Sequence, residues 1–184
     1  MKRFWDNADT RLKAIILAVL IALLNVVAVL LFGLTAADIE QAYISPLAFA
    51  LSITAVIAHI AFCIAFRILR KPEILLGVFI YQMFAVLCYV LFFVGFVGSE
   101  GKDSWFTGFF TVFRWWSVGY QDFMVMIARF TGIPFRFSGP IIYLILTLLT
   151  GRAYISLRKD IRYEQKVQKE KEYVERTKAR HTYN

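Results

Sequence analysis

The chain has 184 residues, 59% of them hydrophobic, and a formal net charge of +8. Soluble globular domains are nearer half apolar, and here the excess lies in long uncharged blocks that give a mean hydropathy of +0.61. This argues against a soluble globular domain and predicts one all-α integral membrane protein. The basic excess lies mostly toward the two ends, which favours the bilayer and its anionic lipids over nucleic acid as a partner.

Four blocks are long and apolar enough to span a bilayer, which takes about 20 residues. We expect them to form a four-transmembrane-helix bundle within residues 1–157. The first block is followed by no convincing small-residue cleavage site, so it is expected to be a retained anchor. Arg152, near the end of the fourth block, must extend to the membrane interface. The predicted spans are residues 14–34, 47–66, 74–97 and 140–157.

The distribution of lysine and arginine predicts the orientation. The N-terminal arm, the turn between the second and third spans, and the chain from Arg152 onward are basic, whereas the connection between the first two spans has no Lys or Arg. By the positive-inside rule both termini are cytoplasmic. Short loops and the absence of an Asn-x-Ser/Thr acceptor favour a bacterial plasma (inner) membrane. The basic residues expected at the inner leaflet are Arg67, Arg70, Lys71, Arg152, Arg158, Lys159 and Arg162.

The segment 104–133, between the third and fourth spans, contains the unusual run FRWWSVGYQDF. A fifth span here would move the basic C-terminal region outside, so the segment must return to its own side. Its periodicity predicts two short amphipathic helices that meet at Ser117 and Gly119. In the second, Phe123, Ile127 and Phe130 are expected on one face, and Asp122 and Arg129 on the other.

Tryptophan and tyrosine prefer the headgroup level, so this segment is expected to lie on the outer interface as a lid. A re-entrant hairpin also leaves an even number of spans, with both termini on one side, and stays open as an alternative. The residues assigned to the outer lid are Trp105, Arg114, Trp115, Trp116, Tyr120, Asp122 and Arg129.

Residues 158–184 lack glycine and proline, and they are predicted to continue the fourth helix as a basic cytoplasmic tail. The tail is either a solvated helix near anionic lipid or a docking helix for a partner protein. Acidic residues are interleaved with the basic ones, which argues against nucleic-acid binding.

The predicted spans contain no Asp or Glu, which argues against carboxylate-bound metals and proton coupling through a membrane carboxylate. No catalytic, metal or cofactor motif occurs, so neither an enzyme nor a cofactor is predicted, and Cys63 and Cys88 are interpreted as small buried hydrophobes. Polar residues fall on helix faces shared with small residues, a pattern typical of interhelical contacts in lipid. These intramembrane candidates are Asn25, Ser52, His59, Tyr81, Gln82, Tyr143, Thr147 and Thr150.

His59 and Gln82 lie at similar expected depths on two spans joined by a short turn, so a hydrogen bond between them is predicted. The polar stripe either holds the bundle together or forms a polar pocket around His59. A catalytic role for His59 is disfavoured, because no nucleophile, base and carboxylate set accompanies it.

Together these features predict a non-enzymatic accessory or structural subunit of a larger membrane complex, with a protein partner or a second copy of the chain. The alternative is a small transporter or substrate-capture subunit that uses the polar stripe beneath the lid. The face formed by Ala14, Ala18 and Ala22, together with the chain length, is similar to the membrane-embedded substrate-binding subunits of energy-coupling-factor transporters. That resemblance covers one helix, and the span count and the basic tail depart from it.

Overall fold

The computed structural model describes residues 9–32, 46–98 and 106–182, and these residues form helices and turns without any strand. Four of the helices are long and apolar enough to cross a membrane, which confirms the four predicted blocks. Trp105 lies outside the described residues. The elements are α2 (Thr10–Phe32), α3 (Pro46–Ile68), α4 (Pro72–Gly98), α5 (Thr107–Trp116), the 3-10 turn η1 (Val118–Tyr120), α6 (Gln121–Thr131) and α7 (Phe135–Thr182).

The fourth long helix begins at Phe135, earlier than the expected start at Pro140. Pro140 therefore lies inside α7, where its ring removes one backbone hydrogen bond. Burial offsets this cost: Phe135 is 2% exposed and packs edge-on against Phe110, with ring centroids 6.2 Å apart. Tertiary packing has thus extended the helix beyond the start that proline indicates in the sequence.

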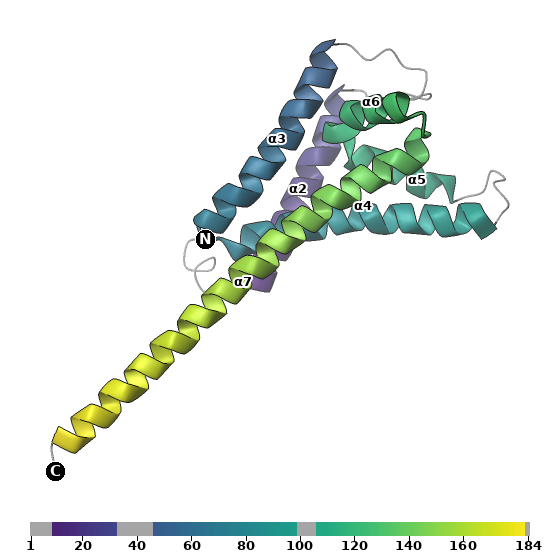
Figure 1. Cartoon of the computed structure of the whole chain (residues 1–184). Helices are drawn as coiled ribbons and strands as arrows, with labels where there is room; N and C mark the ends of the chain where they lie inside the picture. The colour runs from purple at the N-terminus through teal and green to yellow at the C-terminus, as the bar shows by residue number, and fades with distance from the viewer. Residues whose placement is uncertain (1–8, 33–45, 99–105, 183–184) are drawn as a thin grey trace.

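Helix α7 has 48 residues and continues without interruption from its apolar first half into its charged second half. At about 1.5 Å per residue it is roughly 70 Å long, more than twice the ~30 Å thickness of a hydrocarbon core. Figure 1 shows its C-terminal half projecting away from the other helices. From residue 162 to residue 177 every residue except Val167 is exposed.

Helices α2 and α4 meet at their N-terminal ends, where a Cβ placed on Gly77 would lie 3.0 Å from the carbonyl oxygen of Ala14. Small residues allow this close backbone approach, as the alanine face of the first span predicts. Ala14 and Ala18 are both buried. From their short connection α3 and α4 diverge, and α7 packs against both of them (Figure 1).

Helix α5 runs antiparallel to the C-terminal half of α4. The aromatic pairs follow in order along both helices: Phe92 lies 4.8 Å from Phe110 between ring centroids, and Tyr89 lies 5.5 Å from Phe113. Trp116, at the end of α5, stacks on Tyr81 at 5.6 Å. The end of α5 therefore reaches the middle of α4.

The apolar face predicted for the second short helix is not the face that α6 packs against the other helices. Phe130 is 91% exposed, whereas Met124, Val125 and Ala128 are buried. The buried face is offset by about one residue, a rotation of roughly 100° about the helix axis. The reason is tertiary: Met124, Val125 and Ala128 complete one core cluster with residues of α4, α5 and α7, and Phe130 faces away from it.

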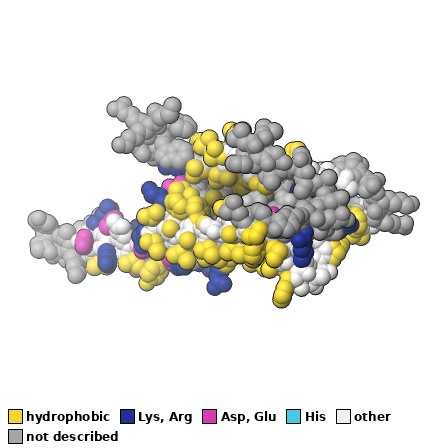
Figure 2. Space-filling view, turned by 90° about the horizontal axis from the view of Figure 1, so that it is seen from above, with side chains coloured by type: hydrophobic (Ala, Val, Ile, Leu, Met, Phe, Trp, Pro, Cys, Tyr) yellow, Lys and Arg dark blue, Asp and Glu magenta, His cyan; other side chains and the backbone are white. Residues whose placement is uncertain are grey.

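The bundle keeps a large apolar exterior. Leu24 is 70% exposed and Val94 is 65% exposed, and similar side chains cover all four long helices. In Figure 2 hydrophobic side chains dominate the described body, while Lys, Arg, Asp and Glu mark the projecting end of α7. Such a surface is typical of helices that face lipid or another membrane protein.

Candidate functional site: a polar socket around the α5–α6 turn

The turn between α5 and α6 exposes backbone groups that no helix partner satisfies. Two of its carbonyls accept hydrogen bonds from side chains of long helices. Asn25 of α2 donates through Nδ2 to the carbonyl oxygen of Trp115, at 3.0 Å. Tyr81 of α4 donates its hydroxyl to the carbonyl oxygen of Trp116, also at 3.0 Å.

Ser52 of α3 acts as a cap for α6, although it belongs to another helix. The N-cap residue of α6, Tyr120, makes no capping bond with its own side chain. Instead the backbone N–H of Phe123 donates to Ser52 Oγ at 2.9 Å. The same hydroxyl donates to the carbonyl oxygen of Gly119 at 3.4 Å. Ser52 therefore supplies the acceptor that an N-cap side chain normally provides.

His59 of α3 lies at the centre of a hydrogen-bonded chain. Its Nε2 is 3.0 Å from Thr150 Oγ1, and its Nδ1 is 3.2 Å from the Tyr120 hydroxyl. Thr150 Oγ1 is also 3.1 Å from the carbonyl oxygen of Leu146, which only accepts. Thr150 therefore donates to Leu146 and accepts from Nε2–H, and Tyr120 donates to Nδ1. A neutral imidazole protonated on Nε2 satisfies every group in this chain.

Cys63, interpreted from the sequence as a small buried hydrophobe, takes part in this cluster. Its Sγ lies 3.8 Å from His59 Nε2 and 3.7 Å from Thr150 Oγ1. The spacing of four residues places Cys63 and His59 on one face of α3, and this is the sequence signal that would have indicated the contact.

The predicted hydrogen bond between His59 and Gln82 is wrong. Both ring nitrogens of His59 are occupied by Tyr120 and Thr150, because η1 and α7 pack against α3 beside this residue. The side-chain amide of Gln82 is buried, and neither of its polar atoms has a hydrogen-bond partner among the described residues. The same holds for the buried hydroxyl of Tyr143.

Most of the predicted polar stripe thus converges on one turn, and we call this group the polar socket. Thr147 lies outside it and bonds the carbonyl oxygen of Tyr143 in its own helix at 2.9 Å. Gln82 and Tyr143 also lie outside it. The polar socket consists of Asn25, Ser52, His59, Tyr81 and Thr150, with Tyr120 as the hairpin side chain that enters it.

The residues assigned to the outer lid divide between the two sides of the hairpin. Trp116 and Tyr120 face the polar socket, whereas Trp115 is 49% exposed. Arg114 and Asp122 are half-buried. The exposed Arg129 borders a shallow cavity of about 210 Å³ at the C-terminal end of α6, together with Val125, Ala128, Gly132, Ile133, Pro134 and Phe135.

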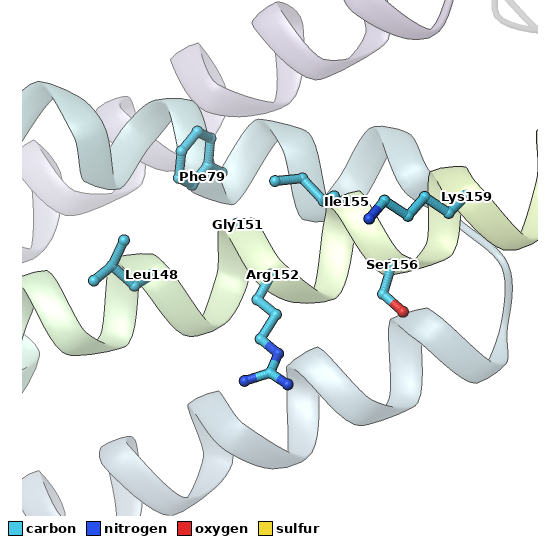
Figure 3. Close-up of a pocket in the computed structure, with 7 residues that line it drawn as sticks. All are labelled: Phe79, Leu148, Gly151, Arg152, Ile155, Ser156 and Lys159. Carbon is cyan, nitrogen blue, oxygen red and sulfur yellow. The ribbon is translucent and has the colours of Figure 1, made fainter.

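The predicted inner-leaflet basic residues also divide into two groups. Arg67 Nη2 lies 3.4 Å from an oxygen of Asp160, and Arg70 makes two hydrogen bonds to Glu164, one of them 2.7 Å long. The remaining basic residues make no ion pair within the described chain. Among these, Arg152 and Lys159 border an open groove of about 450 Å³ (Figure 3).

Glu164 lies seven residues beyond Leu157, on the part of α7 that extends past the predicted span. The hydrogen bond from Arg70 holds the pKa of this carboxyl below its usual range, and the carboxylate in turn raises the pKa of Arg70. Both groups are fully exposed, so solvent screens the pair.

The described residues contain no group of three or more His, Cys, Asp or Glu side chains placed to hold a metal ion. What the polar socket can do chemically is fix the turn of the α5–α6 hairpin against three long helices. No protein-family model, curated protein or solved structure matches this chain.

Proposed function

We propose that this chain is a non-enzymatic polytopic membrane protein that serves as an accessory or structural subunit of a larger membrane complex. The observation that carries the proposal is the C-terminal half of α7, which is charged, exposed and projects beyond the other helices (Figure 1). An isolated helix gains most of its stability from packing, so a projecting helix of this length fits a docking element for a partner. In this proposal the tail also lies near anionic lipid.

The polar socket supports a structural role for the intramembrane stripe. Its side chains satisfy the backbone of the α5–α6 turn, which fits the reading that they hold the bundle together. Non-helical backbone at membrane depth is tolerated where protein buries and satisfies it. We therefore favour a re-entrant α5–α6 hairpin over a lid lying on the outer interface.

The proposed orientation follows from charge. Both termini are cytoplasmic, because Lys and Arg are concentrated on the side of the membrane where the termini lie. The connection at the end of α4 then lies outside. Short connections favour a bacterial plasma membrane as the location.

The experiment compares proteins that co-purify with the tagged full-length chain and with a chain truncated after Leu157, both extracted in mild detergent. We expect one or more proteins to co-purify stoichiometrically with the full-length chain and to be lost on truncation. A third chain has Lys166 and Glu170 exchanged, which keeps the net charge and helix propensity of the tail but changes its charge pattern. A partner that recognises this charge pattern should bind the third chain more weakly than the full-length wild type. Equal partners for all three chains would contradict docking through α7.

A second function, a small transporter or substrate-capture subunit, is favoured by the buried polar atoms of Gln82 and Tyr143, which have no hydrogen-bond partner in the part of the chain that the structure describes. Leaving buried polar groups unpaired costs about 1–3 kcal/mol each, so such groups are expected to have a ligand or ordered water as a partner. Mass spectrometry of the purified protein would detect a bound polar small molecule. In this alternative Gln82→Leu removes it, whereas Thr54→Ala on the exposed face of α3 does not.

A further inference from the structure

The groove beside Arg152 and Lys159 lies along α7, close to the turn that joins α3 to α4. Figure 3 shows it between α4 and α3, which diverge from their common turn and leave α7 accessible between them. Phe79 of α4 forms one wall and packs on Gly151, where an added Cβ would lie 2.8 Å from its ring. The lining residues are Phe79, Leu148, Gly151, Arg152, Ile155, Ser156 and Lys159.

The groove combines apolar and basic side chains: Phe79, Leu148 and Ile155 are apolar, whereas Arg152 and Lys159 are basic. In the proposed membrane placement Leu148 lies nearer the bilayer centre and Lys159 nearer the interface. Lys159 directly precedes Asp160, which pairs with Arg67 at the end of α3. Lys159 lies eleven positions after Leu148 along α7, or about 16 Å at 1.5 Å per residue. That length is about half of a ~30 Å hydrocarbon core, the thickness of one leaflet.

Within the described residues, no carboxylate neutralises the charges of the groove. Arg67 and Arg70 are paired with carboxylates of α7, but Arg152 and Lys159 make no ion pair or hydrogen bond within the described chain. Among the described residues that line the groove, none is acidic. An unpaired arginine one to two turns inside an apolar helix is costly in lipid unless an anion meets it at the interface.

From this charge complementarity we infer that the groove binds one anionic phospholipid of the leaflet nearest the termini. The phosphate meets Arg152 and Lys159, with Ser156 beside them as a hydroxyl donor, and an acyl chain lies against Phe79, Leu148 and Ile155. Basic pockets between membrane helices bind acidic lipid headgroups in this way. The inference rests on the proposed four-span arrangement, which places the groove within a leaflet.

The test is native mass spectrometry of the delipidated full-length protein titrated with phosphatidylglycerol or with phosphatidylcholine of the same acyl chains. We expect one phosphatidylglycerol to be retained, and the double variant Arg152→Gln/Lys159→Gln to weaken that binding by about tenfold or more. The matched control, Arg158→Gln/Arg162→Gln, removes equal charge from the same helix outside the groove and should bind as the wild type does.

A second variant keeps the test decisive if the charge variant fails to fold. Ile155→Trp fills the groove while it keeps both cations, and it should weaken phosphatidylglycerol binding as well. Excess inorganic phosphate should not displace the lipid, because the acyl chain contributes to binding. Equal retention of phosphatidylcholine, equal loss in the control variant, or displacement by phosphate would each overturn the inference. These outcomes do not depend on the partner capture that tests the proposed function.

Discussion

At the scale of single residues, the polar side chains of the spans act mainly on a neighbouring segment rather than on one another. Ser52 caps a helix to which it does not belong, and His59 connects η1 to α7 through both ring nitrogens. The helical spacing of Ser52 and His59 was enough to predict that both face inward. It was not enough to predict their partners, which lie 61 to 91 residues away in the chain for His59 and 67 to 71 away for Ser52.

The His59 variants test the hydrogen-bonded chain directly. His59→Leu leaves the Tyr120 hydroxyl without its acceptor, so we expect it to lower the free energy of unfolding by about 1–3 kcal/mol. His59→Gln is expected to lose less, because an amide can keep one of the two bonds. Unfolding of the purified protein in detergent micelles measures both. Thr54→Ala, which removes only a bond within α3, is the control, and equal stability of the Leu variant and this control would contradict the assignment.

At the scale of elements, hydropathy was enough to find the long helices but not their packing faces. The four spans stand out because each needs about 20 apolar residues to cross lipid. The buried face of α6 does not stand out in the sequence, because α6 has two apolar stripes of similar quality. One is Phe123, Ile127 and Phe130, and the other is Met124, Val125 and Ala128. Which stripe is buried depends on the rotation of α6 in the assembled core, and one short amphipathic pattern cannot specify that rotation.

The contact between α4 and the start of α5 depends on Gly95. A Cβ at this position would lie 2.1 Å from the ring of Phe106, so the ring must move. We expect Gly95→Ala to destabilise the protein by about 1–3 kcal/mol, the usual cost of overpacking. Gly98→Ala has nothing within 4 Å of the added Cβ and serves as the matched control. Micelle unfolding measures both variants, and equal stabilities would show that α5 does not pack here.

The exposed ion pair between Arg70 and Glu164 joins the turn after α3 to α7 where the projecting half of α7 begins, and we expect this pair to respond to pH. Because the folded-state pKa of Glu164 is lowered, its contribution is present above the unfolded value of about 4.3 and is lost as pH falls through the folded value. Spin labels at Ile68 and Ile161 should give a narrow distance distribution at pH 7 that broadens below about pH 4. Glu164→Gln should show the broad distribution already at pH 7. An unchanged distribution in that variant would mean that the pair does not hold α7.

At the scale of the whole molecule, the contacts give the direction of every long helix. Helix α2 starts beside the start of α4, and further along each helix Asn25 and Tyr81 both bond to the end of α5, so α2 and α4 lead away from the same end of the bundle. Helices α3 and α7 run together in the opposite direction, since His59 meets Thr150 and, further along both helices, Arg70 meets Glu164. This alternation is what four crossings require when both termini lie on one side.

The placement of the hairpin turn in the membrane is the last prediction, and it separates a re-entrant hairpin from a surface lid. Single cysteines are introduced in a background in which Cys63 and Cys88 are replaced by alanine. Gly119, at the turn, has open space for an added Cβ, and Thr131 lies exposed at the far end of α6. With α5 about 15 Å long at 1.5 Å per residue, a re-entrant turn lies near the middle of the bilayer.

In sealed vesicles we therefore expect a membrane-impermeant maleimide to label Thr131→Cys from outside but to leave Gly119→Cys unreacted from either side. Brominated lipids give a second measurement of depth by fluorescence quenching. A dye at residue 119 should be quenched most strongly by lipids whose bromines lie near the bilayer centre. Gly98→Cys and Gln168→Cys mark the two aqueous sides, and the positive-inside orientation predicts that only Gly98→Cys reacts from outside. Rapid external labelling of Gly119→Cys would contradict the re-entrant hairpin and would mean that the hairpin lies on the outer interface. The polar socket would then have to lie near that surface as well.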